Sequence, residues 1–376
     1  MNNRRRYLAP WRRATMTAEA VTGVGAGGPA GRELLVALEG KPALYHCLSR
    51  VVDHTFRLGQ DEKEAFVRIL RAYEAFSRVR VLTFCVMSNH FHVLVEVPER
   101  PEKDPGDREL LSWLGVLYSA QQVAEVRREL EHHRSHGNHA AAEALRQRFL
   151  RRMWDLSCFM QGVKQRFTRW FNRRHRRTGC LWDERFKSVL VEDGHAARVV
   201  AAYIDLNPVR AGIVRRPGAY RWSGWGEAVV GKVRAREGLR QVMLERELAR
   251  SKAEVAVAAV AGWNEVEAEY GRLMAEDLGK RKGGAGGGSV GGRCLGEGRR
   301  GAIPETELVR RRVRWFVDGL VVGSQGFVDG VFELTRRRFS VGRASGARRM
   351  PKADTSLRSM RALRVRVYGP APGGAT

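Results

Sequence analysis

The sequence has few cysteines and no long apolar run, and each shortage excludes a class of protein. Its five cysteines are scattered and never form a C-x-x-C pair, which argues against a disulfide framework or a thiolate zinc site and favours a reducing compartment. The longest weakly polar run, residues 255–263, is too short to span a bilayer, and the basic N-terminus lacks the apolar stretch of a secretory signal. We therefore expect a soluble, cytoplasmic protein without a membrane partner.

Acidic residues are also scarce relative to basic ones. The 376 residues include 67 Lys and Arg but only 41 Asp and Glu, which gives a formal net charge of +26. An excess of this size favours a polyanionic partner, above all a nucleic acid, and argues against a neutral metabolic enzyme. Disorder of the whole chain is excluded as well, because 43% of the residues are hydrophobic and nine are Trp.

The order of the expected elements predicts an α+β fold. Strand patterns cover residues 43–51, 79–86, 90–97 and 181–191, and helical patterns cover residues 61–76, 156–174 and 194–206. The resulting order of strand, helix, strand, strand, helix, strand, helix suits a ferredoxin-like antiparallel sheet with helices on one face.

The composition changes along the chain predict several further segments. We expect a flexible basic arm over residues 1–40, a candidate catalytic domain over 41–230 with a helical insertion at about 105–152, a helical extension over 231–282, a Gly-rich linker over 283–303, an Arg-rich helical module over 304–350 and a flexible tail over 351–376. The Arg-rich module has a helix–Gly–helix pattern. It is either an accessory DNA-binding module or a helical pair that packs on the catalytic layer.

Two histidines stand at the head of an apolar strand pattern, in the run Asn89-His90-Phe91-His92. Side chains on a strand alternate between its faces, so His90 and His92 point the same way while Phe91 points into the core. Two imidazoles at positions i and i+2 can bind one metal ion from one face. The alternative is that the histidines only form hydrogen bonds at a sheet edge.

A tyrosine and an asparagine share a helix face in the run Tyr203-Ile204-Asp205-Leu206-Asn207-Pro208. Tyr203 and Asn207 are four residues apart and thus about 6 Å apart along a helix axis. A tyrosine hydroxyl can attack phosphorus as a nucleophile, and the amide oxygen of Asn207 could join a cation held by the histidines. On this evidence alone, Tyr203 serves packing as readily as catalysis.

Three segments together resemble a known family. The sequences VLTFCVMSNHFHVLVEVP, VKQRFTRWFNRRHRRTGCLWDERFKSVLVED and AAYIDLNPVRAGIV look like the REP-associated tyrosine transposases, a branch of the HUH single-strand transposase superfamily. The resemblance covers roughly residues 43–225. It implies the HUH fold, a divalent ion bound by His90 and His92, and Tyr203 as the nucleophile that forms a 5′-phosphotyrosine and releases a 3′-OH. Asn207 stands where relatives carry a polar third ligand.

The chemistry of these ligands limits the choice of metal. Two imidazoles and an amide oxygen, completed by water and phosphate, fit Mg²⁺ or Mn²⁺. The resemblance allows either a monomer or a homodimer, because some members of the superfamily exchange the tyrosine helix.

A basic stretch over residues 161–187 predicts a surface for single-stranded or hairpin DNA. It carries nine Lys and Arg against two acids, with aromatic residues between them. Cations on phosphates with aromatics for base stacking are typical of single-strand binding. We expect Phe167 and Trp170 in the core, and we expect DNA contacts from six of the nine cations: Arg173, Arg174, Arg176, Arg177, Arg185 and Lys187. The alternative is that these cations form an ordinary solvated face.

Three functional hypotheses follow from the sequence. The first is a metal-dependent transposase that cleaves and rejoins single-stranded DNA near hairpin-forming repeats. The second is a domesticated, non-catalytic binder of hairpin DNA or RNA, which would bind without metal and form no covalent adduct. The third is a metal-dependent hydrolase, which would turn over without a covalent intermediate.

Overall fold

The structure is a computed structural model, and it describes most of the chain between residues 41 and 361. The described residues are 34, 38, 41–55, 57–243, 262–275, 303–304, 309–311, 313–336, 339, 342–350 and 353–361. Nearly all of the predicted basic arm and Gly-rich linker, parts of the predicted helical extension and module, and the end of the predicted tail lie outside these residues.

A mixed seven-stranded sheet forms the centre of the fold. Its strands run in the order β2-β3-β1-β4-β6-β9-β7, with the bounds β1 Ala43–Arg50, β2 Arg80–Val86, β3 His90–Val97, β4 Lys187–Val191, β6 Gly319–Gly323, β7 Arg348–Arg349 and β9 Arg358–Arg361. The first four strands pair antiparallel, but β6 runs parallel to β4. Strands β5 (Ile303–Pro304) and β8 (Ala353–Asp354) form a separate parallel pair. The α+β class is confirmed, while the sheet is mixed and not antiparallel throughout.

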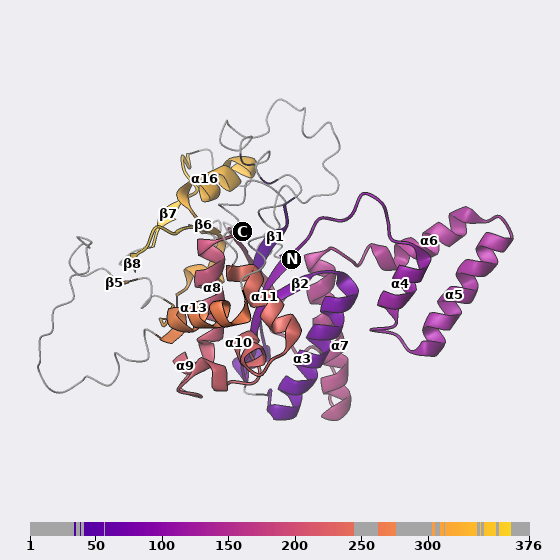
Figure 1. Ribbon diagram of the computed structural model, residues 1–376, viewed down its shortest axis with the longest axis horizontal. Coiled ribbons are helices and arrows are strands. Elements are labelled where there is room, and N and C mark those ends of the chain that lie inside the picture. The colour runs from indigo at the N-terminus through magenta and orange to yellow at the C-terminus, as the bar shows by residue number, and fades with distance from the viewer. Residues whose placement is uncertain are drawn as a thin grey trace, which may run out of the picture.

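Helices cover both faces of the sheet, so the prediction of helices on one face is wrong (Figure 1). Helices α3 (Gln60–Ser77) and α7 (Leu156–Arg174) pack on one face, where the rings of Phe66 and Phe91 lie 4.5 Å apart. The opposite face is covered by α8 (His195–Asp205), α10 (Gly224–Val229), α11 (Val233–Met243) and α13 (Trp263–Ala275). The central strands are apolar on both faces: Val93 belongs to the first core, and Leu94 to the second.

Short helices connect these layers. They are the 3₁₀ helices η2 (Val52–His54) and η3 (Pro217–Ala219) and the one-turn α9 (Asn207–Arg210). Among the helices that the structure describes, none is both long and apolar enough to cross a membrane.

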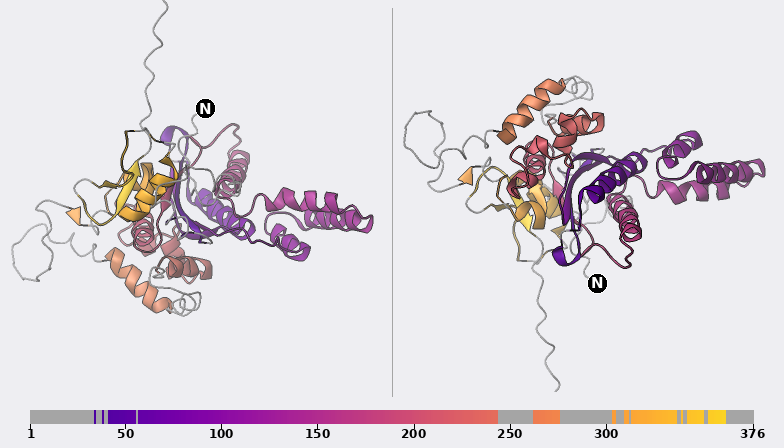
Figure 2. Two further views of the ribbon diagram at one scale, coloured as in Figure 1. Left: turned by 90° about the horizontal axis from the view of Figure 1, so that it is seen from above. Right: turned by 90° about the horizontal axis from the view of Figure 1, so that it is seen from below.

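Three helices extend from the body of the molecule as an arm (Figure 2). They are α4 (Asp107–Leu114), α5 (Ala120–Ser135) and α6 (His139–Leu150). Ser119 and Gln122 form a capping box at the start of α5, which satisfies amide groups that a helix end leaves unpaired. Arg146 on α6 pairs with Asp107 on α4 and so ties the first and last helices of the arm together.

The C-terminal region adds strands to the sheet, which differs from the predicted helical module and tail. The chain there runs α15 (Trp315–Asp318), β6 and α16 (Gln325–Leu334), so a strand replaces the expected helix–Gly–helix turn. Residues 319–323 are a short apolar run between glycines, and Val321 and Val322 are fully buried against β4 and β9. Such a run fits a buried strand as well as a helix. Strand β9 likewise lies inside the predicted tail, with Met360 buried.

Candidate functional site

Strand β3 places two predicted site residues on one face of the sheet. His90 and His92 begin this strand, and their ring centroids lie 5.1 Å apart. They face the layer of α8, while Phe91 between them belongs to the core under α3. On β1, Arg50 pairs in register with His90 and therefore lies on the same face. A positive charge thus accompanies the two imidazoles.

A third histidine, which the sequence analysis did not single out, contacts this pair. His46 lies on β1, and its Nε2 is 2.9 Å from Nδ1 of His92. The two rings stack with centroids 5.1 Å apart, and Nδ1 of His46 is 2.7 Å from the carbonyl oxygen of Phe316. Strand alternation in residues 43–50 could have placed His46 beside Leu44 and Leu48 on one face, but only the register of β1 against β3 brings it to His92.

Helix α8 brings Tyr203 to the same place. Its ring centroid lies 6.2 Å from that of His92 and 6.3 Å from that of His46. The ring of Phe316 covers it from the C-terminal region at 5.1 Å, and Tyr203 is only 3% exposed. The structure therefore brings the predicted nucleophile and one predicted metal ligand together, in a buried setting.

Arg210 is a second residue that the sequence analysis missed. Its guanidinium carbon lies 4.1 Å from the centre of the Tyr203 ring, and Nη2 donates a 2.7 Å hydrogen bond to the carbonyl of Tyr203. A further hydrogen bond goes to the carbonyl of Val309. Burial lowers the pKa of this arginine from its usual value. The sequence contains one indication of this contact: Arg210 follows Tyr203 by seven residues, which is about two turns of a helix.

Asn207 lies one turn after Tyr203, as predicted, and its side-chain NH2 group forms hydrogen bonds to carbonyls of α8. Its Nδ2 donates to the carbonyls of Ile204 (3.1 Å) and Tyr203 (3.4 Å). In the part of the chain that the structure describes, the side-chain hydrogen bonds of Asn207 go to the preceding helix α8, and none joins Asn207 to His90 or His92.

Asp205, which lies between Tyr203 and Asn207 in the motif, has a structural role. Its carboxylate is fully buried and accepts hydrogen bonds from the Thr83 hydroxyl (2.8 Å), the Tyr270 hydroxyl (2.7 Å) and the Trp225 amide (3.1 Å). Burial raises its pKa to about 6, although these three hydrogen bonds lower it. The donors come from β2, α13 and α10, so Asp205 fixes α8 against three other elements.

The two central histidines are neutral at physiological pH because they are buried. Burial, opposed by the hydrogen bond to Phe316, lowers the pKa of His46 to about 4. Burial also lowers the pKa of His92 well below its usual value, and the positive charges that His46 and His90 would carry when protonated lower it further. Neutral imidazole is the form that binds a metal ion.

The histidine pair fits a divalent ion as a two-ligand site. Nδ1 of His90 lies 2.6 Å from the side-chain oxygen of Asn89, which can only accept, so Nδ1 carries the proton and Nε2 the lone pair in the neutral ring. Within the described ranges, no three His, Cys, Asp or Glu side chains are arranged to hold a metal ion. Further ligands would come from an amide, water or phosphate, as a hard divalent ion accepts.

The predicted DNA-binding cations divide into exposed and paired residues. Arg173, Arg176 and Arg185 are exposed. Arg174 is also exposed but forms an ion pair with Asp61 on α3, and it stacks on Trp170.

The other two cations are less accessible than predicted. Lys187 at the start of β4 lies 2.6 Å from a carboxylate oxygen of Asp318, and Arg177 is half-buried beside the ring of Phe171. Phe167 is fully buried, as expected. Trp170 was also expected in the core, but it is only partly buried.

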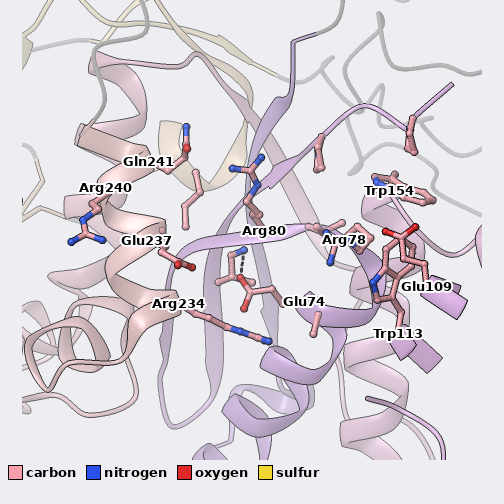
Figure 3. Close-up of a pocket in the computed structure, with 17 residues that line it drawn as sticks. Glu74, Arg78, Arg80, Glu109, Trp113, Trp154, Arg234, Glu237, Arg240 and Gln241 are labelled. Carbon is pink, nitrogen blue, oxygen red and sulfur yellow. Dashed lines mark hydrogen bonds between the residues drawn. The ribbon is translucent and has the colours of Figure 1, made fainter. Parts of the chain in front are cut away.

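A surface cavity of about 860 Å³ lies apart from the histidines, along the edge strand β2 (Figure 3). Arginines, glutamates and two tryptophans line it, among them Arg78, Arg80, Glu74, Trp113 and Trp154. No predicted site residue belongs to its lining. A second cavity of about 840 Å³ beside α7 includes Arg185 and Trp182.

Comparisons with known proteins give only a distant likeness, and it is to solved structures. No family model and no curated protein matches the chain. One similar solved structure is that of a REP-associated tyrosine transposase bound to a REP hairpin, with 13% identity, 50% of this chain and 80% of that chain covered, and a TM-score of 0.33. At this level, the likeness does not establish a common fold, and the family resemblance of the three motifs stays a prediction.

Proposed function

We propose that the chain is a metal-dependent tyrosine transposase that cleaves and rejoins single-stranded DNA near hairpin-forming repeats. The observation that supports the proposal most is the approach of Tyr203 to His92, with ring centroids 6.2 Å apart. These residues lie on a helix and a strand far apart in the sequence. The motifs that resemble the REP-associated transposases contain both residues.

His90 and His92 would hold the divalent ion, Mg²⁺ or Mn²⁺, and the amide oxygen of Asn207 would join them. The bound ion would offset negative charge on a non-bridging phosphate oxygen as the transition state forms. Arg50, in register with His90, would bind a neighbouring phosphate.

Tyr203 would carry out the bond exchange. Its phenolic oxygen forms a bond to the phosphorus, the bond from phosphorus to the 3′ oxygen breaks, and that oxygen leaves as a 3′-OH after taking up a proton. The phenol loses its own proton during the attack. Arg210, stacked on the ring, would stabilise the negative charge that develops on the phenol oxygen. Rejoining is the reverse reaction with another 3′-OH.

The exposed cations Arg173, Arg176 and Arg185 would contact the DNA backbone. Because His92 and Tyr203 belong to one chain, a single copy has both groups, which supports a monomer over a homodimer that exchanges the tyrosine helix.

The experiment is a covalent-capture assay with Tyr203→Phe. A hairpin-bearing single strand labelled at its 3′ end should stay attached to the wild-type protein after denaturation, since the 5′-phosphotyrosine retains the downstream fragment. A 5′ label should be released instead. We expect no adduct with Tyr203→Phe or after EDTA treatment, and an undiminished adduct with Tyr220→Phe, because Tyr220 donates its hydroxyl to the carbonyl of Val86. An adduct that survives Tyr203→Phe overturns the assignment.

One observation favours the alternative of a non-catalytic hairpin binder. Tyr203 is 3% exposed beneath Phe316, so a phosphodiester reaches it only after the C-terminal region moves. A binder would give the same fluorescence anisotropy with hairpin DNA or RNA in the presence and absence of EDTA, and no adduct with either label.

A further inference from the structure

A continuous chain of hydrogen bonds runs from the C-terminal region to the candidate metal ligand. It begins at the backbone carbonyl of Phe316 in α15, passes through both ring nitrogens of His46 and ends at Nδ1 of His92, with separations of 2.7 Å and 2.9 Å. His46 is 2% exposed and His92 is 4% exposed, so solvent does not compete for these contacts. His46 and Phe316 both lie outside the motifs that the sequence analysis used.

The chemistry of the acceptors fixes the position of each proton along this chain. The carbonyl of Phe316 can only accept, so Nδ1 of His46 must carry a proton. In the neutral ring, Nε2 of His46 then has a lone pair, and it can only accept. The nitrogen facing it, Nδ1 of His92, must therefore carry a proton and donate. This leaves the lone pair of His92 on Nε2.

Burial supports the neutral form of His46 on which this sequence of donors depends. A charged imidazolium in this position would have no exposed edge for water, and it would lie 6.3 Å from the Tyr203 ring on which the cation of Arg210 is stacked. It would also donate from both nitrogens, and His92 would then have to accept at Nδ1 and carry its proton on Nε2. That tautomer cannot bind a metal through Nε2.

We propose that His46 is a positioning residue that holds His92 in the Nδ1–H tautomer, so that the Nε2 lone pair of His92 is ready to bind a divalent ion. The proposal deepens the proposed function and rests on it for the presence of that ion. A hydrogen-bonded partner on the second nitrogen fixes the tautomer and orientation of metal-binding histidines in general, and loss of such a partner weakens metal affinity by about 10- to 100-fold.

In the same arrangement His90 and His92 each donate from Nδ1, and different partners supply the two acceptors. The side-chain oxygen of Asn89 accepts from Nδ1 of His90, and Nε2 of His46 accepts from Nδ1 of His92. Both rings thus carry their lone pair on Nε2. One partner is a neighbour in sequence, whereas the other belongs to β1.

The first test needs no variant and no metal. In protein labelled with ¹⁵N at histidine, long-range ¹H–¹⁵N spectra assign the protonated nitrogen of each ring. We expect Nδ1–H in both His46 and His92, together with a scalar coupling across the N–H···N hydrogen bond between them. A spectrum with His92 protonated at Nε2 overturns the proposal whatever the protein does to DNA.

A matched pair of variants then tests the effect on metal binding. His46→Gln retains an acceptor at the place of Nε2, and His46→Met has similar length but no such acceptor. We expect His46→Met to release His92 from its Nδ1–H tautomer and to weaken Mn²⁺ binding, measured by calorimetry, by about 10- to 100-fold. His46→Gln should remain near wild type in both measurements.

The outcomes separate this proposal from the proposed function. Equal Mn²⁺ affinity in wild type and a folded His46→Met variant overturns the role of His46. If wild type binds no Mn²⁺, the metal site of the proposed function fails, and the ready-ligand role of His46 fails with it. If Mn²⁺ binds as expected but Tyr203 forms no adduct with DNA, the proposed function fails and the role of His46 stands.

Discussion

Changing Asp205 to asparagine tests the cluster that holds α8, and with it Tyr203, against the sheet. The carboxylate accepts hydrogen bonds from Thr83, Tyr270 and Trp225, which lie on three different elements. Burial raises its pKa to about 6, because an ionised group is costly in a site that water does not reach. Asparagine has nearly the same size but does not titrate, and its NH2 group cannot accept a hydrogen bond where a carboxylate oxygen did. The loss of that bond is the same at every pH, so the pH-dependent part of the difference isolates the cost of the buried charge.

The sign and the size of the effect follow from the raised pKa of Asp205. The folded state keeps the proton up to about pH 6, whereas the unfolded chain loses it near 3.8. The contribution of Asp205 to the free energy of unfolding is therefore fully present below about pH 4 and is lost as the pH rises through 6. A pKa difference of one unit corresponds to about 1.4 kcal/mol, so the rise to about 6 corresponds to about 3 kcal/mol. Between pH 4 and pH 7, the free energy of unfolding of Asp205→Asn should therefore rise by this amount relative to that of wild type.

Urea unfolding at pH 4, 5, 6 and 7 measures the difference directly. All other titrating groups are common to wild type and Asp205→Asn, so their contributions cancel when the two free energies of unfolding are subtracted. Tyr270→Phe is the control. It removes a donor to the carboxylate, so it should destabilise the protein more at pH 7 than at pH 4. A difference between wild type and Asp205→Asn that is constant with pH would refute the buried-charge explanation.

Two further predictions concern the site and its support. Arg210→Met should slow adduct formation in single-turnover assays by about tenfold or more, because it removes the positive charge stacked on Tyr203; an unchanged rate would remove Arg210 from the mechanism. Gly238→Ala should lower the free energy of unfolding by about 1–3 kcal/mol, because the new Cβ would lie 2.5 Å from the backbone oxygen of Leu82. Gly326→Ala is its control, because its Cβ would meet nothing within 4 Å; equal losses in both variants would show that the close contact of α11 with β2 is not the cause.

Local patterns in the sequence predicted the elements around the site well. Because side chains along a strand point to alternate faces, a strand over residues 90–97 predicted Phe91 in the core and the two histidines on the other face, and the structure has this arrangement. The helical spacing of residues 61–76 corresponds to α3. These predictions succeed because each depends on the residues of one element. The faces of a strand or helix follow from its own periodicity.

The features that the sequence did not predict depend on pairing between distant segments. His46 reaches His92 only through the antiparallel register of β1 and β3, in which His46 lies opposite Leu94. The strand Gly319–Gly323 pairs with β4 across more than a hundred residues, and no local signal separates it from a helix. Helices on both faces also escaped prediction, because strand β3 is apolar on both faces and does not show a clean alternation.

The contacts of the C-terminal region argue against a boundary of the functional unit at residue 230. Phe316 packs on the ring of Tyr203 and gives its carbonyl to His46, while Arg210 donates to the carbonyl of Val309. Residues 41–230 alone would lose each of these partners, and the buried Nδ1–H of His46 would need another acceptor. The tautomer of the proposed metal ligand His92 and the cover over the proposed nucleophile Tyr203 thus depend on one segment. A movement of α15 that opens Tyr203 to DNA would also change the hydrogen bond that orients His92, so the two events are coupled through Phe316.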